Sequence, residues 1–269
     1  MAGHPTRRRR AARVPVAAAV VCASLLTAGP ALADGGSADP SARQLADDAK
    51  KELLDARSLH LAVTNRADDD RDARTPGAFD LRLDQDGNCT GSLRMGTGGA
   101  DGGSVDLVKR GDEVWMKPDA TFWKTQVSGG SGALAAQVFK DRYVHGTTDD
   151  PMLAGLADVC DLDALRAQLD KGAGRPTQKP LDKGDATTVD DTRVVPLTGR
   201  DDDSRLTLYV TEDAPHRLVR ATEKSPDETV TMTFTDYGAP VPTSTPSADE
   251  SVDISQLHDV DPDGTPPQV

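Results

Sequence analysis

The first regular pattern of apolar and polar residues begins at Ser41. Leu45, Ala49, Leu53 and Ala56 recur at intervals of three or four, and charged residues occupy most positions between them. This spacing predicts an amphipathic helix that buries one face, at the start of the folded part of the chain.

Alternation of apolar and polar residues then replaces the helical spacing. The alternating segments lie at residues 59–63, 79–83, 91–95, 105–109 and 114–117. A period of two predicts half-buried strands, and the residues Asp86, Gly87 and Asn88 between two of them are typical of a hairpin turn. We expect residues 122–124 to form a further strand of the same antiparallel meander.

Helical signals return in the middle of the chain. Leu134, Val138 and Phe139 predict a short helix, and Pro151 stands where the first residue of a second helix is expected. A third helix runs from Leu162 through Leu165 and Leu169 to Gly172, so Cys160 lies between the last two.

A second block of strands follows a linker rich in Pro, Gly and Lys. Its alternating segments are residues 187–190, 193–197, 206–210, 218–221 and 230–234. From Pro240 onward, residues 241–269 are rich in Pro, Ser and Asp, which predicts a loosely ordered tail.

These elements predict one α+β domain over residues 41–240. About ten short antiparallel strands in two blocks, with helices before and between them, favour a sheet that packs helices on one face and meets water on the other.

The N-terminus is typical of an export signal at residues 1–33, followed by a flexible leader at 34–40. Arginines at 7–13 precede an apolar run at 14–26 and an Ala-Leu-Ala cleavage motif at 31–33. The run is shorter than the ~20 residues of a spanning helix. A lipid anchor at Cys22 is the alternative, disfavoured because Val21 stands where a lipoprotein signal has a small residue. We expect a soluble secreted product.

Cys89 and Cys160 remain after removal of the signal. In an oxidising compartment the first interpretation is a disulfide between them. The alternative is a nucleophile elbow centred on Cys89, but such an elbow needs a strand-to-helix turn and the residues after Cys89 alternate like a strand.

Charge and motifs exclude several function classes. The formal net charge of the chain is −13, and outside the arginine-rich signal 26 Lys and Arg face 44 Asp and Glu, a net of −18. Such a body is a poor binder of nucleic acid. The scattered histidines lack zinc spacing, and no serine-hydrolase or nucleotide-binding motif is present. We expect a monomer that uses no metal or cofactor. The lack of motifs alone does not exclude an enzyme, because carboxylate pairs leave little trace in a sequence.

Both tryptophans lie in the segment GDEVWMKPDATFWK at residues 111–124. They either pack in the core or line an apolar cavity. With DGNCTG at 86–91 and LADVCDL at 156–162, this segment resembles the actinobacterial envelope lipoprotein family of the LppX and LprG type. Through that family the chain is similar to the lipoprotein carriers LolA and LolB, over most of residues 41–240.

The resemblance implies a strongly curved antiparallel half-barrel with helices packed on its concave side, an apolar cavity between them, and a role in holding or moving lipids or glycolipids outside the cytoplasmic membrane. The missing lipoprotein cysteine motif is the main departure from the family.

We therefore expect an exported, non-enzymatic lipid- or lipoprotein-binding carrier of the cell envelope. The alternative is an envelope sensor or interaction module that binds a partner protein with the same fold, and a secreted hydrolase is a third class. The expected cavity wall comprises Leu61, Val63, Leu81, Leu83, Leu93, Met95, Trp115, Trp123, Leu208, Met232 and Phe234.

Overall fold

The computed structural model describes residues 39–67, 76–96, 102–127, 130–172, 180–201 and 203–254. The expected signal peptide, Cys22, nearly all of the leader and the tail beyond Ile254 lie outside the described residues.

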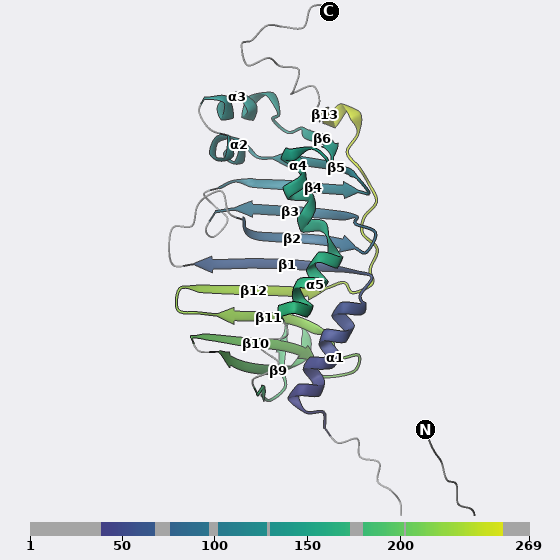
Figure 1. The fold of residues 1–269 in the computed structure, drawn as a ribbon, viewed down its shortest axis with the longest axis vertical. Coiled ribbons are helices and arrows are strands. Elements are labelled where there is room, and N and C mark those ends of the chain that lie inside the picture. The colour runs from purple at the N-terminus through teal and green to yellow at the C-terminus, as the bar shows by residue number, and fades with distance from the viewer. Residues whose placement is uncertain are drawn as a thin grey trace, which may run out of the picture. The chain divides into compact units, whose positions relative to one another are not determined.

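An open sheet of thirteen strands dominates the fold (Figure 1). The strands are β1 (Ser58–Ala67), β2 (Pro76–Asp84), β3 (Cys89–Met95), β4 (Ser104–Arg110), β5 (Glu113–Pro118), β6 (Tyr143–Thr147), β7 (Asp182–Lys183), β8 (Thr187–Val189), β9 (Thr192–Asp201), β10 (Ser204–Thr211), β11 (Leu218–Lys224), β12 (Glu228–Thr235) and β13 (Ser251–Asp253). Their order is β13-β6-β5-β4-β3-β2-β1-β12-β11-β10-β9-β7, with β8 also pairing with β9. Every pair is antiparallel except β13 with β6.

The helices are α1 (Ala42–Asp55), α2 (Ala120–Gln126), α3 (Ser131–Val138), α4 (Pro151–Ala157) and α5 (Leu162–Gly172), with short 3₁₀ turns η2 (Asp158–Cys160) and η4 (Ala248–Glu250). The α+β class with an unclosed, curved antiparallel sheet is confirmed. The sheet has more strands than the ten expected. The sequence pattern did not reveal β6, β7 and β13, because these short strands have too few residues for a clear alternation.

Helix α1 forms as its sequence predicts. Ser41 caps it, and the side chain of Gln44 returns a hydrogen bond to the Ser41 backbone, which satisfies free N–H groups of the first turn. Leu45, Ala49 and Leu53 are buried on one side, so the apolar stripe of the sequence becomes the packed face of the helix.

Residues 122–124 do not form a strand, so that prediction is wrong. Pro118 ends β5, and the carboxylate of Asp119 accepts a hydrogen bond from Phe122 N and starts helix α2 instead. The same carboxylate accepts bonds from the backbone N–H and hydroxyl of Ser104. A helix cap therefore outweighs the strand preference of Phe122 and Trp123.

The chain after Pro240 is not a loose tail as far as Ile254. Val241 and Ile254 are buried, and residues 251–253 pair in parallel with β6 as strand β13. The N–H of Ile254 donates to His145 O at 2.8 Å. The ordered structure of this segment could not be predicted from its polar composition, because only isolated apolar residues hold the segment in place.

The expected disulfide is present between Cys89 on β3 and Cys160 on η2, 71 residues apart in sequence. Both cysteines are completely buried. The bond joins the centre of the sheet to the helical segment α4–η2–α5, so it fixes where those helices cross the strands.

Removal of this disulfide is expected to destabilise the domain strongly. Closing a loop of 71 residues restricts the unfolded chain, which corresponds to about 4 kcal/mol on the chain-entropy model. The variant Cys89→Ala/Cys160→Ala should lose that amount in urea unfolding. Wild type measured in reductant is the matched comparison, and equal stability of oxidised and reduced wild type would contradict the expectation.

Truncation of Ile254 tests the ordered end of the chain. The side chain of Ile254 is 2 % exposed, and it lies close to Leu153 of α4 beside Gly146. Ile254→Ala should therefore cost about 3 kcal/mol in unfolding free energy. The exposed Thr245→Ala in the same segment should cost almost nothing, and equal effects of the two variants would show that the segment is not packed.

Candidate functional site

One face of the sheet is apolar. Strand pairing places Leu61 opposite Leu81 on one side and Phe234 on the other, and the row continues through Leu107 and Met116. All five are at most 3 % exposed. We call this side the apolar face; it consists of the residues of this row and those two positions away along each strand.

The opposite face is largely polar. His60, Arg82 and Thr90 are neighbours across β1, β2 and β3, and Val108 and Trp115 continue the row on β4 and β5. Because side chains alternate along a strand, every residue in this row points away from the apolar face.

Helices cover part of the apolar face. Figure 1 shows α1, α4 and α5 lying across the strands on one side of the sheet. Cys89, which neighbours Leu83 on the apolar face, bonds to Cys160, so η2 and the adjoining helices lie on that side. Leu153 and Leu162 are buried beneath them.

Polar contacts also hold α1 against the sheet. The guanidinium of Arg217 lies 3.6 Å from the carboxylate of Glu52 on α1 and 5.3 Å from the ring of Tyr237. The Tyr237 hydroxyl donates to Leu218 O at 2.7 Å, and burial raises the pKa of this hydroxyl. The α1 end of the apolar face is therefore closed by packed and hydrogen-bonded groups.

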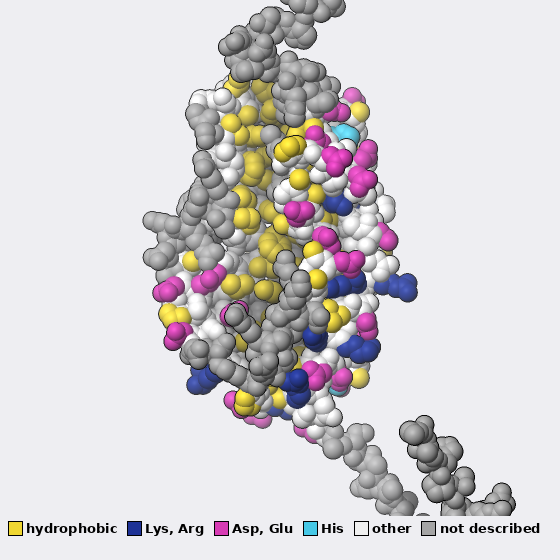
Figure 2. Space-filling model, in the orientation of Figure 1, with side chains coloured by type: hydrophobic (Ala, Val, Ile, Leu, Met, Phe, Trp, Pro, Cys, Tyr) yellow, Lys and Arg dark blue, Asp and Glu magenta, His cyan; other side chains and the backbone are white. Residues whose placement is uncertain are grey.

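Burial of the apolar face decreases along the strands. Two residues beyond the Leu61 row lies a second row. Its members on β2, β1, β12, β11 and β10 are only half-buried, whereas Leu93 and Leu197, which pair with its two ends, are buried. We call these half-buried residues the apolar strip. They are neighbours in the order Phe79 on β2, Val63 on β1, Met232 on β12, Ala221 on β11 and Leu208 on β10. Figure 2 shows hydrophobic side chains gathered in a band on the face of the molecule that it draws. The strip is thus an apolar surface that the described helices cover only partly.

Nine of the eleven expected wall residues share the apolar face. Leu61, Leu81, Leu83, Leu93, Met95 and Phe234 are buried on it, and Val63, Leu208 and Met232 belong to the strip. The structure therefore brings most of the sequence candidates together, from strands far apart in the chain.

The two tryptophans are the exceptions. Trp115 lies on the opposite face, where its ring stacks on His145 with centroids 4.6 Å apart, and its neighbour Met116 takes the apolar face. Trp123 lies in helix α2 and packs against Phe139, with centroids 5.3 Å apart. Neither therefore belongs to the wall formed by the strands.

Phe79 and Ala221 are strip residues missing from the sequence candidates. Phe79 follows the same alternation as Leu81, a selected residue on the same strand, so the pattern alone was sufficient to find it. Ala221 is small, so hydrophobicity alone does not single it out, and its place in the strip follows from its pairing with Met232.

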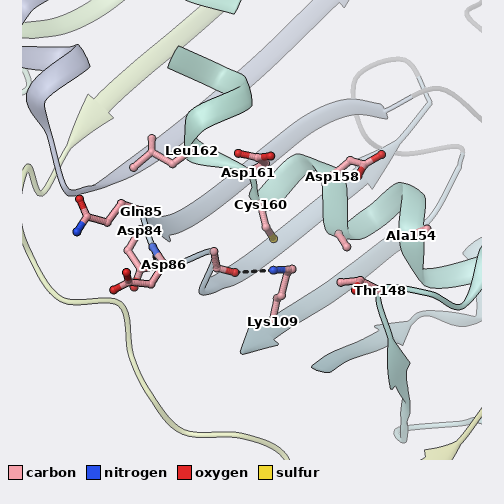
Figure 3. Close-up of a pocket in the computed structure, with 12 residues that line it drawn as sticks. Asp84, Gln85, Asp86, Lys109, Thr148, Ala154, Asp158, Cys160, Asp161 and Leu162 are labelled. Atoms are coloured by element: carbon pink, nitrogen blue, oxygen red, sulfur yellow. Dashed lines mark hydrogen bonds between the residues drawn. The ribbon is translucent and has the colours of Figure 1, made fainter. Parts of the chain in front are cut away.

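A pocket of about 360 Å³ lies beside the disulfide (Figure 3). Three of its charged groups serve local structure. Asp84 accepts hydrogen bonds from the backbone of Asp86 and Asn88 in the hairpin turn, Lys109 Nζ donates to the carbonyl of Gly87, and Asp161 caps α5.

His60 on the polar face contacts a carboxylate and a hydroxyl. Its ring nitrogens lie 2.7 Å from Asp80 Oδ1 and 3.1 Å from Thr235 Oγ1. A hydrolase relay needs a substrate pocket beside its hydroxyl, and Thr235 does not line the pocket beside the disulfide.

In the described part of the chain, no three or more His, Cys, Asp or Glu side chains gather in a way that would hold a metal ion. Nor does any helix in the described ranges have the length and hydropathy needed to cross a bilayer.

Comparison with known proteins gives matches among solved structures. No family profile and no curated protein sequence matches the chain. The crystal structure of the lipoprotein LppX from Mycobacterium tuberculosis matches with a TM-score of 0.47 and 13 % identity, over 76 % of this chain and 98 % of that one. LprF from Mycobacterium bovis matches with a TM-score of 0.49 and 16 % identity, over 77 % and 97 %.

A LolA superfamily protein from Nitrosomonas europaea matches with a TM-score of 0.22 and 13 % identity, over 76 % of this chain and 96 % of that one. The solved structures to which this chain is similar therefore include mycobacterial lipoproteins and a LolA superfamily protein.

Proposed function

We propose that this protein is an exported, non-enzymatic carrier of the cell envelope that holds acyl chains of a lipid, glycolipid or lipoprotein on the apolar strip. The half-buried row from Phe79 to Leu208 is the observation that carries the proposal. The expected signal peptide places the protein outside the cytoplasm, where such ligands are found.

The chemistry of the strip suits an acyl chain. Val63, Phe79, Leu208, Ala221 and Met232 present no charged or hydrogen-bonding side-chain group. Apolar surface left partly in water is unfavourable, and each methylene of a ligand buried against it gains roughly 0.8 kcal/mol. A surface without polar groups does not select a head group, so affinity would come mainly from the hydrocarbon.

The arrangement of the sheet also suits a long ligand. The strip crosses five neighbouring strands, so its direction is perpendicular to them. Strands lie about 4.8 Å apart, which gives the strip the extended, narrow form of a hydrocarbon chain. A compact polar substrate would find few partners along it.

Substitution of Met232 tests the proposal against a control on the same strand. Met232→Asp places a charge on the strip and should weaken binding of a fluorescent fatty acid at least about tenfold, because a carboxylate beside hydrocarbon is poorly solvated. Thr233→Asp places the same charge on the opposite face, and it should bind like wild type. Equilibrium fluorescence titration measures both.

The controls separate binding from folding. Thermal unfolding should show that Met232→Asp remains folded, and the milder Met232→Gln should give an intermediate affinity. Equal affinities for Met232→Asp and Thr233→Asp would contradict the carrier proposal. Capture of one stoichiometric protein by a form that binds no fatty acid would instead favour the sensor or interaction module.

Mass spectrometry of protein purified from its own culture tests export and cargo together. A mature mass starting at Asp34, two hydrogens light and accompanied by an extractable lipid, supports the proposal. A mass starting at an acylated Cys22 would show membrane anchorage instead, and a protein without extractable lipid would oppose the carrier function.

A further inference from the structure

Helix α3 exposes apolar side chains at one end of the sheet. Leu134 is 63 % exposed and Val138 is 55 % exposed, and they are the exposed large hydrophobic residues of the part of the chain described here. They are four positions apart, so they project from the same side of the helix. Exposed apolar groups that gather in this way mark an interaction surface.

The charge of this region differs from that of the rest of the protein. All 44 Asp and Glu lie beyond residue 33, yet residues 120–140 contain none of them and include Lys124 and Lys140. This is the longest stretch without an acidic residue after the expected signal peptide. Of the acids that flank it, Asp119 is engaged in capping α2 and binding Ser104.

The exposed pair rests on a packed support. Trp123 of α2 lies against Phe122 and Phe139, with centroids 6.0 Å and 5.3 Å away. Gly132 of α3 lies so close to Trp123 O that a Cβ there would be 2.5 Å from it. This close approach fixes α3 against α2. Leu134 and Val138 are exposed because they lie on the side of α3 that this packing leaves uncovered.

These helices also adjoin the interior of the carrier. Phe122, Val127 and Ala135 are partly buried and pack against the same hydrophobic core as the strip. Figure 1 shows α2 and α3 at the end of the sheet near β6 and β13. Apolar surface thus extends from the exposed side of α3 to the core beneath it.

We propose that α3, together with Lys124 and Lys140, is a docking surface for an anionic lipid bilayer. Leu134 and Val138 enter the interfacial region, and the two lysines contact negatively charged head groups. The inference rests on the proposed carrier function and deepens it, because it identifies the end of the domain at which lipid is exchanged with a membrane.

Vesicle flotation tests the docking surface. The mature protein, residues 34–269, is mixed with vesicles of phosphatidylcholine alone or of phosphatidylcholine with phosphatidylglycerol. Wild type should bind the anionic vesicles, and added salt should weaken the binding because it screens the lysines. Leu134→Ser/Val138→Ser should bind at least about tenfold more weakly. Both side chains are exposed, so the melting temperature should not change.

A matched pair of charge variants tests the role of the lysines. Lys124→Gln/Lys140→Gln should reduce binding to the anionic vesicles. Arg205→Gln/Lys224→Gln removes two exposed cations that face each other on β10 and β11, toward the other end of the sheet. This control should bind like wild type; equal losses in both pairs would overturn the assignment to α3.

A soluble ligand distinguishes failure of docking from failure of the carrier function. Leu134→Ser/Val138→Ser should still bind a fluorescent fatty acid from solution, but it should extract lipid from anionic vesicles more slowly than wild type. Unchanged vesicle binding and extraction in this variant would overturn the docking inference alone. Wild type that binds vesicles but no fatty acid would overturn the carrier function.

Discussion

The bond between Cys89 and Cys160 is the constraint on which the arrangement of this protein depends. The helices α4 and α5 occur in the chain between the two blocks of strands, and they have to lie on the apolar face of a sheet that both blocks build. Cys89 stands on that face and Cys160 between the helices, so one covalent bond sets their position. The hydrophobic residues that the helices bury, such as Leu153 and Leu162, then need only pack locally.

Such a bond lets the domain remain stable with an incompletely covered sheet. Hydrophobic residues make up 36 % of the chain and aromatic residues 3 %, which limits the apolar area available for a large core. If the sheet closed into a barrel, the strip from Phe79 to Leu208 would become part of the barrel interior. Because a disulfide restricts the unfolded chain, its stabilisation does not require covering that strip. The same residues can then serve a ligand, and the sheet has no need to close into a barrel.

The sequence was informative where periodicity decides the outcome. Alternation along a strand fixes which residues share a face, and for this reason Leu61, Leu81 and Phe234 could be assigned together before their pairing was known. Alternation does not assign Trp115 to a face, because Val114, Trp115 and Met116 are all apolar. The pairing of Met116 with Leu107 shows which face each of the three takes. Strand β13 was missed because its three residues show no clear alternation and its partner β6 lies more than a hundred residues earlier in the chain.

A protein with the proposed carrier function faces opposing requirements at the membrane. It has to approach a surface that its net charge disfavours, and it has to leave again with its cargo. Near an anionic surface each lysine contributes about 1 kcal/mol, so Lys124 and Lys140 provide a modest attraction, to which Leu134 and Val138 add a small apolar contact. The strongly negative remainder of the domain opposes any other orientation. Weak attraction at one end and repulsion elsewhere together orient the domain, and they keep its attachment reversible.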